Sequence, residues 1–207
     1  AVKELVIAAL LMAARNLLPA ARFVDGLEGD DQTLHKLVED GKKQFAGSEL
    51  PGRTLGVIGL GKIGSLVADA AIKLGMNVLG YDPEITVDAA WSLPAQVRKA
   101  HTIEEVLKAA DFITLHVPLV PATRGLVNAK RALLLKKGAV LLNFSREGIV
   151  DNDAVLEALK AKLLRTYVCD FPAQKLLGHP QVISLPHLGA STGEAEDNCA
   201  VMVADQL

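Results

Sequence analysis

The stretch TLGVIGLGKIGSL, residues 54–66, decides the fold class of this chain of 207 residues. It begins as an apolar, strand-like run, passes through the turn GLGKIG (residues 59–64), and continues with helical spacing. In a G-x-G-x-x-G turn the first glycine permits the tight bend, the second lets the backbone approach a pyrophosphate, and the third lets helix and strand pack closely. The motif alone is a weak signal. Between a strand and a helix, it predicts a dinucleotide site with the phosphates at the helix N-terminus.

An acidic residue ends the next strand-like run, NVLGYD (residues 77–82). Asp82 lies close to the spacing of about 20 residues that separates this acid from the glycine turn in dinucleotide-binding units. A carboxylate there can accept hydrogen bonds from both ribose hydroxyls and would repel a 2′-phosphate. The alternative is an ordinary turn residue before Pro83. With turn, strand and spacing all present, the sequence predicts NAD as the cofactor in preference to NADP.

Strands and helices alternate from Pro51 onward. Apolar strand-like runs occupy residues 54–60, 77–82, 112–117, 139–145, 166–171 and 181–186. Helical stretches lie between them at residues 62–75, 102–111, 129–138 and 151–162, with Gly75 and Gly138 expected to end helices and Asp151 to cap one. Runs apolar on both faces are typical of buried parallel strands. The pattern predicts an α/β fold, a doubly wound (Rossmann-type) parallel sheet flanked by helices.

Residues 1–50 have a different character. Apolar residues at helical spacing predict an amphipathic first helix that packs against a larger body, and Glu4 and Arg15 argue against a signal peptide. Residues 31–50 are polar and suit a solvated helix or an arm that contacts a partner subunit. We therefore expect residues 1–50 to form an interdomain helix and arm. Residues 51–207 would form the nucleotide-binding domain, ending in a returning helix from residue 193.

Composition excludes several classes of function. The net charge of -2 and the pI of about 6.2 favour neither nucleic acid nor an anionic membrane as a partner. Aromatic residues make up only 4%, too few for a base-stacking surface. The two cysteines, Cys169 and Cys199, provide neither a disulfide framework nor metal-ligand spacing. We expect a cytoplasmic protein without a bound metal.

Polar residues follow the predicted strands at the edge where doubly wound sheets bind ligands. They are His116, Pro118, Ser145, Arg146, Asp170 and His187. Each has an ordinary alternative: Arg146 as a solvated cation, Asp170 as a turn residue, and His116 as a core histidine, which we favour. A hydrolase triad of Ser145, His187 and Asp170 is disfavoured, because Ser145 lacks the G-x-S-x-G turn.

Five segments together are similar to one enzyme family. They are LGVIGLGKIG (55–64), GYDP (80–83), ADFITLHVPLVPATRGLVN (110–128), KKGAVLLNFSREGIVDNDAVLEAL (136–159) and LPHLGAST (185–192). The chain resembles the NAD-dependent D-2-hydroxyacid dehydrogenases almost end to end. The resemblance implies an oxidoreductase that transfers hydride from a small 2-hydroxyacid to NAD, with D-3-phosphoglycerate, in serine biosynthesis, as the expected substrate.

The resemblance also assigns roles. Arg146 would bind the substrate carboxylate through its bidentate guanidinium, and His187 would take the proton of the 2-hydroxyl. Asp170 would lie near the nicotinamide carboxamide. The cofactor-binding set would be Gly59, Gly61, Lys62, Ile63, Gly64, Asp82, Pro118, Phe144, Ser145, Arg146, Asp170, His187, Gly189 and Ala190.

Two positions depart from the family pattern. Members usually carry a glutamate that pairs with the histidine, and Gln174 stands at that position, so we place Gln174 beside Arg146 and His187 in the catalytic set. Without that carboxylate, the acidic limb of the pH–rate profile should lie lower than in a relative with glutamate, and Gln174→Glu should move it. Lys162 replaces a common helix-ending glycine, so that helix is expected to end less sharply.

Family members also have a second, substrate-binding domain, which we expect to be absent from this chain, so that the fragment alone would turn over little. The resemblance leaves alternatives: another 2-hydroxyacid dehydrogenase acting on glyoxylate, hydroxypyruvate or lactate, or a non-catalytic NAD-binding sensor or corepressor. A homodimer through the nucleotide-binding domain is the expected assembly.

Overall fold

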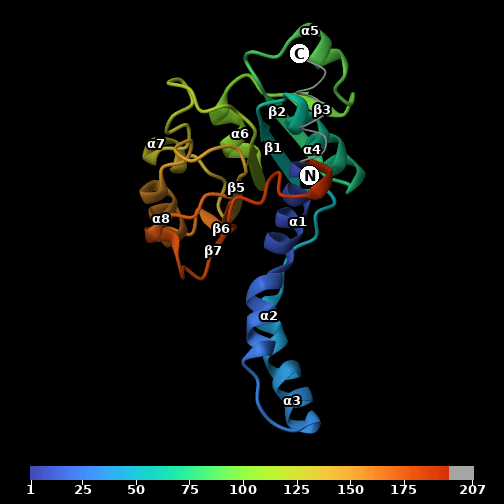
Figure 1. Ribbon diagram of the computed structural model, residues 1–207, viewed down its shortest axis with the longest axis vertical. Helices are drawn as coiled ribbons and strands as arrows, with labels where there is room; N and C mark the ends of the chain where they lie inside the picture. The colour runs from blue at the N-terminus through green and yellow to red at the C-terminus, as the bar shows by residue number, and fades with distance from the viewer. Residues whose placement is uncertain (196–207) are drawn as a thin grey trace.

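A seven-stranded parallel sheet forms the centre of the molecule in the computed structural model, which describes residues 1–195 (Figure 1). The strands are β1 (Thr54–Ile58), β2 (Asn77–Tyr81), β3 (Val97–Lys99), β4 (Phe112–Leu115), β5 (Ala139–Asn143), β6 (Leu164–Cys169) and β7 (Val182–Ser184). All neighbouring pairs are parallel, in the order β3-β2-β1-β4-β5-β6-β7. The predicted doubly wound sheet is confirmed. The six predicted strands all form, and only the short edge strand β3 was missed.

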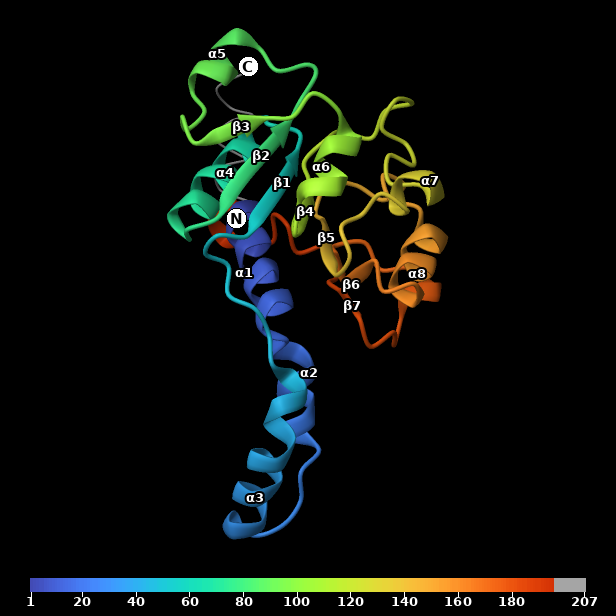
Figure 2. The ribbon, with the colours of Figure 1, turned by 180° about the vertical axis from the view of Figure 1, so that it is seen from behind.

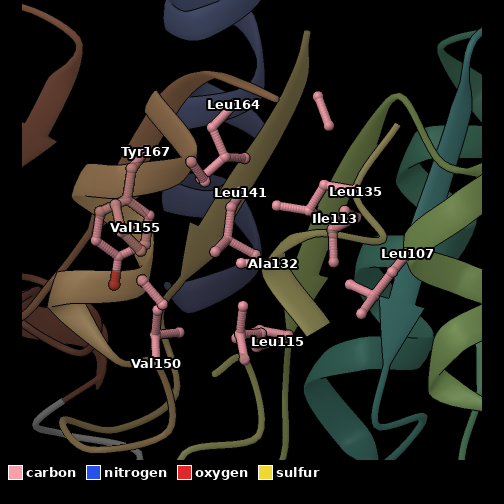
Figure 3. Close-up of a cluster of buried hydrophobic side chains, with 14 of the residues drawn as sticks. Leu107, Ile113, Leu115, Ala132, Leu135, Leu141, Val150, Val155, Leu164 and Tyr167 are labelled. Atoms are coloured by element: carbon pink, nitrogen blue, oxygen red, sulfur yellow. The ribbon is translucent and has the colours of Figure 1, made fainter. Parts of the chain in front are cut away.

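Helices cover both faces of the sheet (Figure 2). α1 (Val2–Arg15) and α4 (Lys62–Lys73) pack on one face, while α6 (Ile103–Ala109), α7 (Ala129–Ala132) and α8 (Asn152–Lys160) lie on the other. The core under α6, α7 and α8 is built from aliphatic side chains such as Leu107, Ile113 and Leu141, together with Tyr167 (Figure 3). The first helix is buried along one side, as its spacing predicts, through Val6, Leu10 and their neighbours.

Helices α4 and α8 end in the same way, with a residue in the left-handed conformation, although only α4 has a glycine there. After α4, Gly75 has a φ of 79°, and the N–H groups of Gly75 and Met76 bond back into the last turn. After α8, Lys162 takes the same left-handed conformation with a φ of 58°, and the N–H groups of Lys162 and Leu163 make the equivalent bonds. The expectation that this helix ends less sharply is therefore wrong. Lys162 instead carries backbone strain that glycine would avoid.

The helix predicted over residues 129–138 is shorter in the structure, where α7 ends at Ala132. Beyond α7 the chain continues in turns, and the N–H of Lys136 donates to the carbonyl of Leu107 in α6 (3.1 Å). This bond takes the backbone away from the helical path. Gly138, with a φ of 77°, therefore lies in the turn that enters β5. The prediction that Gly138 ends a helix is wrong.

A helical arm projects from the body in both views (Figures 1 and 2). It consists of α2 (Leu17–Asp25), α3 (Asp31–Gly41) and the 3-10 turn η1 (Lys42–Phe45), and Asn16, with a φ of 53°, separates it from α1. No side chain of α2 or α3 is buried by the described residues. Within residues 1–195 no single helix is long and apolar enough to span a bilayer. Only α1 and α2 together reach that length, with a bend of 67° between them.

Two short elements complete the description: α5 (Val87–Trp91), which follows β2, and the 3-10 turn η2 (Gln174–Leu176), which follows β6. The chain becomes helical again at Gly193, at the start of the predicted returning helix. Most of that predicted helix lies outside the described residues.

Candidate cofactor-binding and active site

The glycine turn after β1 has the geometry that a pyrophosphate site requires. Gly59 has a φ of 93°, and a Cβ there would lie 2.4 Å from the carbonyl oxygen of His116. A Cβ on Gly64 would lie 1.9 Å from the carbonyl oxygen of Gly59, so helix and turn pack as closely as the motif predicts. Gly61, which caps α4, has no atom of the described residues within 4 Å of its Cβ position. The open space in front of Gly61, at the helix N-terminus that begins with Lys62, suits a phosphate.

Asp82 lies at the end of β2 beside this turn. One carboxylate oxygen accepts a hydrogen bond from the N–H of Leu60 (2.8 Å), and the other from the N–H of Glu84 (2.9 Å). Each oxygen keeps a lone pair for a ligand, since a carboxylate accepts about four hydrogen bonds. The acid is thus held against the glycine turn, in the place where the ribose of a dinucleotide would lie.

A cavity of about 240 Å³ lies where β4 and β5 end, next to the first turn of α4. It is lined by Val2, Ile63, His116, Val117, Pro118, Phe144, Ser145 and Arg146. Five of the eight belong to the predicted cofactor set. Val2 and Val117 were missed, because an apolar residue at a helix start or strand end carries no chemical signal in the sequence.

His116 was expected to be an ordinary core histidine, yet it lines this cavity. Its Nε2 lies 2.9 Å from the hydroxyl of Thr114, and burial lowers the pKa of His116 to about 4. The imidazole is therefore neutral near pH 7. It forms part of the cavity wall and cannot serve there as a cation.

Ser145 and Asn143 shape the turn that carries Arg146. The Ser145 hydroxyl donates to the carbonyl of Leu115 (2.5 Å) and accepts from the N–H of Val117 (3.1 Å), which joins the ends of β4 and β5. The buried Asn143 amide donates to the carbonyl of Arg146 (3.0 Å). Sequence reasoning missed Asn143, although a polar residue within an apolar strand was the available signal. With its hydroxyl committed in this way, Ser145 is not a free nucleophile, which argues further against a hydrolase.

The side chain of Arg146 is exposed at the mouth of the cavity, and its Nη1 donates to the carbonyl of Ser145 (2.7 Å). No salt bridge within the described chain involves Arg146. The remaining guanidinium donors can therefore receive a carboxylate in bidentate fashion.

Asp170 holds the loop that carries His187. The carboxylate, only 1% exposed, accepts hydrogen bonds from the N–H groups of Leu188 (2.7 Å) and Gly189 (2.8 Å). Gly189 is buried against Asp170 and Val2. The sequence offered Asp170 as a cofactor contact or a turn residue; its observed bonds are to the loop backbone.

His187 is exposed at the end of β7 and has a φ of 57°, an uncommon conformation for a residue other than glycine, although histidine is among those enriched in it. Its ring packs on Phe171, with 5.0 Å between ring centroids. Gln174 is exposed at the start of η2, and no hydrogen bond joins it to His187 in the part of the chain that the structure describes. His187, Gln174 and Ala190 lie outside the lining of the 240 Å³ cavity, near the ends of β6 and β7.

Among residues 1–195 no group of three or more histidine, cysteine or acidic side chains is placed to hold a metal ion.

A parallel sheet in this strand order, with a glycine turn after β1 and an acid after β2, defines a dinucleotide-binding domain. The chain belongs to the D-isomer specific 2-hydroxyacid dehydrogenase family, whose NAD-binding domain matches residues 7–189. It is 40% identical, over its whole length, to a D-3-phosphoglycerate dehydrogenase of Methanocaldococcus jannaschii, of which it covers 38%. It is 44% identical to one of Bacillus subtilis, over 79% of this chain and 32% of that protein. The chain thus spans about a third of the length of these relatives.

Solved structures show the same fold. The TT0316 protein of Thermus thermophilus superposes with a TM-score of 0.78 at 31% identity, over 96% of this chain and 61% of that one. The apo-structure of the D-lactate dehydrogenase of Escherichia coli gives a TM-score of 0.79 at 27% identity, over 94% of this chain and 58% of that one.

Proposed function

We propose that the whole protein oxidises D-3-phosphoglycerate to 3-phosphohydroxypyruvate with NAD, as a step of serine biosynthesis. The observation that carries this proposal is the alignment along one sheet edge of the glycine turn, Arg146 and the loop that presents His187. The relatives named D-3-phosphoglycerate dehydrogenase, at 40% and 44% identity, support the choice of substrate.

Each side chain has a defined task in this reaction. The glycine turn and the start of α4 bind the pyrophosphate, and Asp82 accepts the ribose hydroxyls. Bound NAD supplies the acceptor for the hydride that leaves the substrate carbon. Arg146 grips the carboxylate and orients that carbon, while the His187 imidazole takes the proton of the 2-hydroxyl as the carbonyl forms. Asp170 keeps the His187 loop in place through two backbone N–H groups.

There are two alternatives: a dehydrogenase for another 2-hydroxyacid, and a non-catalytic NAD-binding module, to which Gln174 gives weight. The presence of both Arg146 and His187 opposes the second, because a sensor needs neither a carboxylate clamp nor a proton acceptor. The substrate-side residues that would separate phosphoglycerate from glyoxylate, hydroxypyruvate or lactate are expected on the second domain.

One assay distinguishes these functions. It measures NADH formation with each 2-hydroxyacid, or NADH consumption with each 2-oxoacid, by the full-length protein and by a His187→Ala control. We expect turnover with D-3-phosphoglycerate that the substitution reduces by about a thousandfold or more, consistent with loss of an acid–base catalyst. Faster turnover with another 2-hydroxyacid would show that the proposed substrate is wrong and that the proposed type of reaction is right. No turnover with any of them would reject the enzyme.

We also propose that the protein forms a homodimer through its nucleotide-binding domain, with the arm at residues 17–45 as part of the contact, and works in the cytoplasm. The arm presents Leu17 (49% exposed) and Val24 (53% exposed) to its surroundings, and a second copy would cover these apolar side chains. The composition argues against nucleic acid or a membrane as a partner.

A further inference from the structure

The imidazole of His187 has no hydrogen-bond partner in the part of the chain that the structure describes, and it takes part in no ion pair there. Two other histidine rings do have partners. The Nε2 of His116 lies 2.9 Å from the Thr114 hydroxyl. The Nδ1 of His179 accepts the N–H of Gln181 at 3.2 Å. A histidine that moves a proton is usually oriented by a hydrogen bond at its second ring nitrogen, so His187 must be oriented in another way.

The ring of His187 contacts one aromatic side chain, that of Phe171 at the end of β6. The two ring centroids are 5.0 Å apart, and the ring planes are tilted by 53°. This separation lies in the range in which aromatic rings attract each other beyond the burial of their surface. Phe171 is half-buried and His187 is exposed, so the mobile partner of the pair is the imidazole.

The backbone of Phe171 is fixed by its neighbours at the ends of β6 and β7. The buried thiol of Cys169 donates to the carbonyl of Phe171 (3.5 Å) and lies 3.6 Å from the hydroxyl of Ser184 in β7. The N–H of Leu185 donates to the carbonyl of Cys169 (2.8 Å). The end of β6 is therefore joined to the strand that leads into His187, and the phenyl ring extends from a rigid backbone.

The backbone of His187 is constrained as well. Its φ is 57°, and the two residues that follow it donate their N–H groups to the Asp170 carboxylate. With the backbone held, the direction of the imidazole depends on the side-chain torsions, which allow several staggered rotamers. Contact with Phe171 selects among these rotamers. Asp170 and Phe171, adjacent in the sequence, thus hold the loop backbone and the histidine ring respectively.

We propose that Phe171 is a positioning residue for His187, whose ring selects the rotamer in which the imidazole takes the proton of the 2-hydroxyl. The proposal rests on the dehydrogenase function proposed above. A phenyl ring is neither a hydrogen-bond donor nor an acceptor, so it leaves both imidazole nitrogens available, one for the substrate and one for water. Gln174 makes no hydrogen bond to His187 in the described residues, and Phe171 takes the orienting role.

Steady-state kinetics of the full-length protein test this role. Phe171→Leu keeps an apolar side chain and removes the ring, so the imidazole should spend less time in the productive rotamer. We expect kcat with D-3-phosphoglycerate to fall about three- to tenfold, the change in population that loss of one aromatic pair produces. KM and the dissociation constant of NADH should stay unchanged, because other residues bind the substrate carboxylate and the cofactor.

Two further variants separate positioning from general stability. Phe171→Tyr keeps the ring and should keep kcat near that of the unaltered protein. Trp91→Leu, the matched control, removes a ring on α5 that is 85% exposed and should leave kcat unchanged. A purely structural role of Phe171 would lower the unfolding midpoint of Phe171→Leu and would leave kcat of the folded fraction unchanged.

A spectroscopic measurement detects the contact without turnover. In the full-length protein with ¹³C at histidine Cε1, the His187 resonance is assigned by its loss in His187→Ala. It should show nuclear Overhauser contacts with the ring protons of Phe171, and it should shift in Phe171→Leu, where the ring current is absent. Because the Overhauser contacts are read in the unaltered protein, they do not depend on whether the variants fold.

Three results would overturn the inference: an unchanged kcat in Phe171→Leu, a Phe171→Tyr variant as impaired as Phe171→Leu, or a His187 resonance without contacts to Phe171. Absence of turnover with every 2-hydroxyacid would reject the proposed function and, with it, the role of Phe171. The resonance would still report the ring contact, so the two failures can be told apart.

Discussion

Neutralising Asp170 should release the loop that carries His187. Its carboxylate is 1% exposed and accepts bonds from the N–H groups of Leu188 at 2.7 Å and Gly189 at 2.8 Å. A hydrogen bond to a charged group contributes about 1.5–3 kcal/mol, against about 0.5–1.5 kcal/mol for a neutral one. Asparagine keeps one acceptor oxygen and turns an NH₂ group toward the other backbone N–H. Asp170→Asn should therefore lower the free energy needed to detach the His187 loop from the domain by about 2–4 kcal/mol.

Hydrogen exchange of the full-length protein measures this cost. A loss of 2–4 kcal/mol corresponds to exchange roughly 30 to 1,000 times faster at the two amides, read in peptides that cover residues 185–192. Turnover should fall as well, because His187 would spend less time in position.

Asp151→Asn is the matched control, since Asp151 also accepts two backbone N–H bonds, from Asp153 at 2.9 Å and Ala154 at 3.5 Å, at the exposed start of α8. It should speed exchange only in the first turn of that helix. If exchange at Leu188 and Gly189 did not change in Asp170→Asn, or changed equally in Asp151→Asn, the claim that Asp170 holds the His187 loop in place would be refuted.

Three further predictions concern other parts of the chain. Asp82→Asn should shift cofactor preference toward NADPH by about tenfold in a calorimetric titration, because it removes a charge next to the 2′-phosphate position at a cost of about 1–2 kcal/mol; an unchanged ratio would place the ribose elsewhere. Lys162→Gly should raise the free energy of unfolding in urea by about 0.5–1 kcal/mol, because left-handed strain of about 1–2 kcal/mol is relieved and part of the gain is lost to the more mobile unfolded chain; a destabilised variant would contradict this. Burial lowers the pKa of His116 from 6.5 to about 4, so the unfolded chain binds a proton there that the folded chain does not, and stability falls as the pH drops through that window. His116→Gln should remove up to about 3 kcal/mol of this pH dependence, measured by urea unfolding above pH 6.5 and near pH 4; equal slopes in both proteins would contradict it.

The sequence was sufficient for the sheet because its central strands are buried on both faces and therefore read as long apolar runs. β3 escaped that reasoning, since its three residues include Arg98 and Lys99, both exposed on an edge strand. The glycine turn was equally readable, because close packing at Gly59 and Gly64 admits no other residue.

Hydrogen-bond partners were beyond the reach of the sequence. A carboxylate at a strand end can bind a ligand or its own backbone, and only the folded structure shows that Asp170 bonds to the loop. At Lys162, backbone hydrogen bonds to the last turn of α8 outweigh the preference of lysine for a negative φ. The preference of a single residue type does not predict this outcome.

Blocking the open space at Gly61 tests the central claim, that the glycine turn is the cofactor site, most directly. Gly61 has a φ of -68°, which valine adopts without left-handed strain, and no atom of the described residues lies within 4 Å of its Cβ position. A calorimetric NADH titration of full-length Gly61→Val should show binding weakened about a hundredfold or more, because the side chain occupies the pyrophosphate position. Its unfolding midpoint should stay unchanged, and the arm variant Gly26→Val should bind normally. Unweakened NADH binding by Gly61→Val would contradict the account.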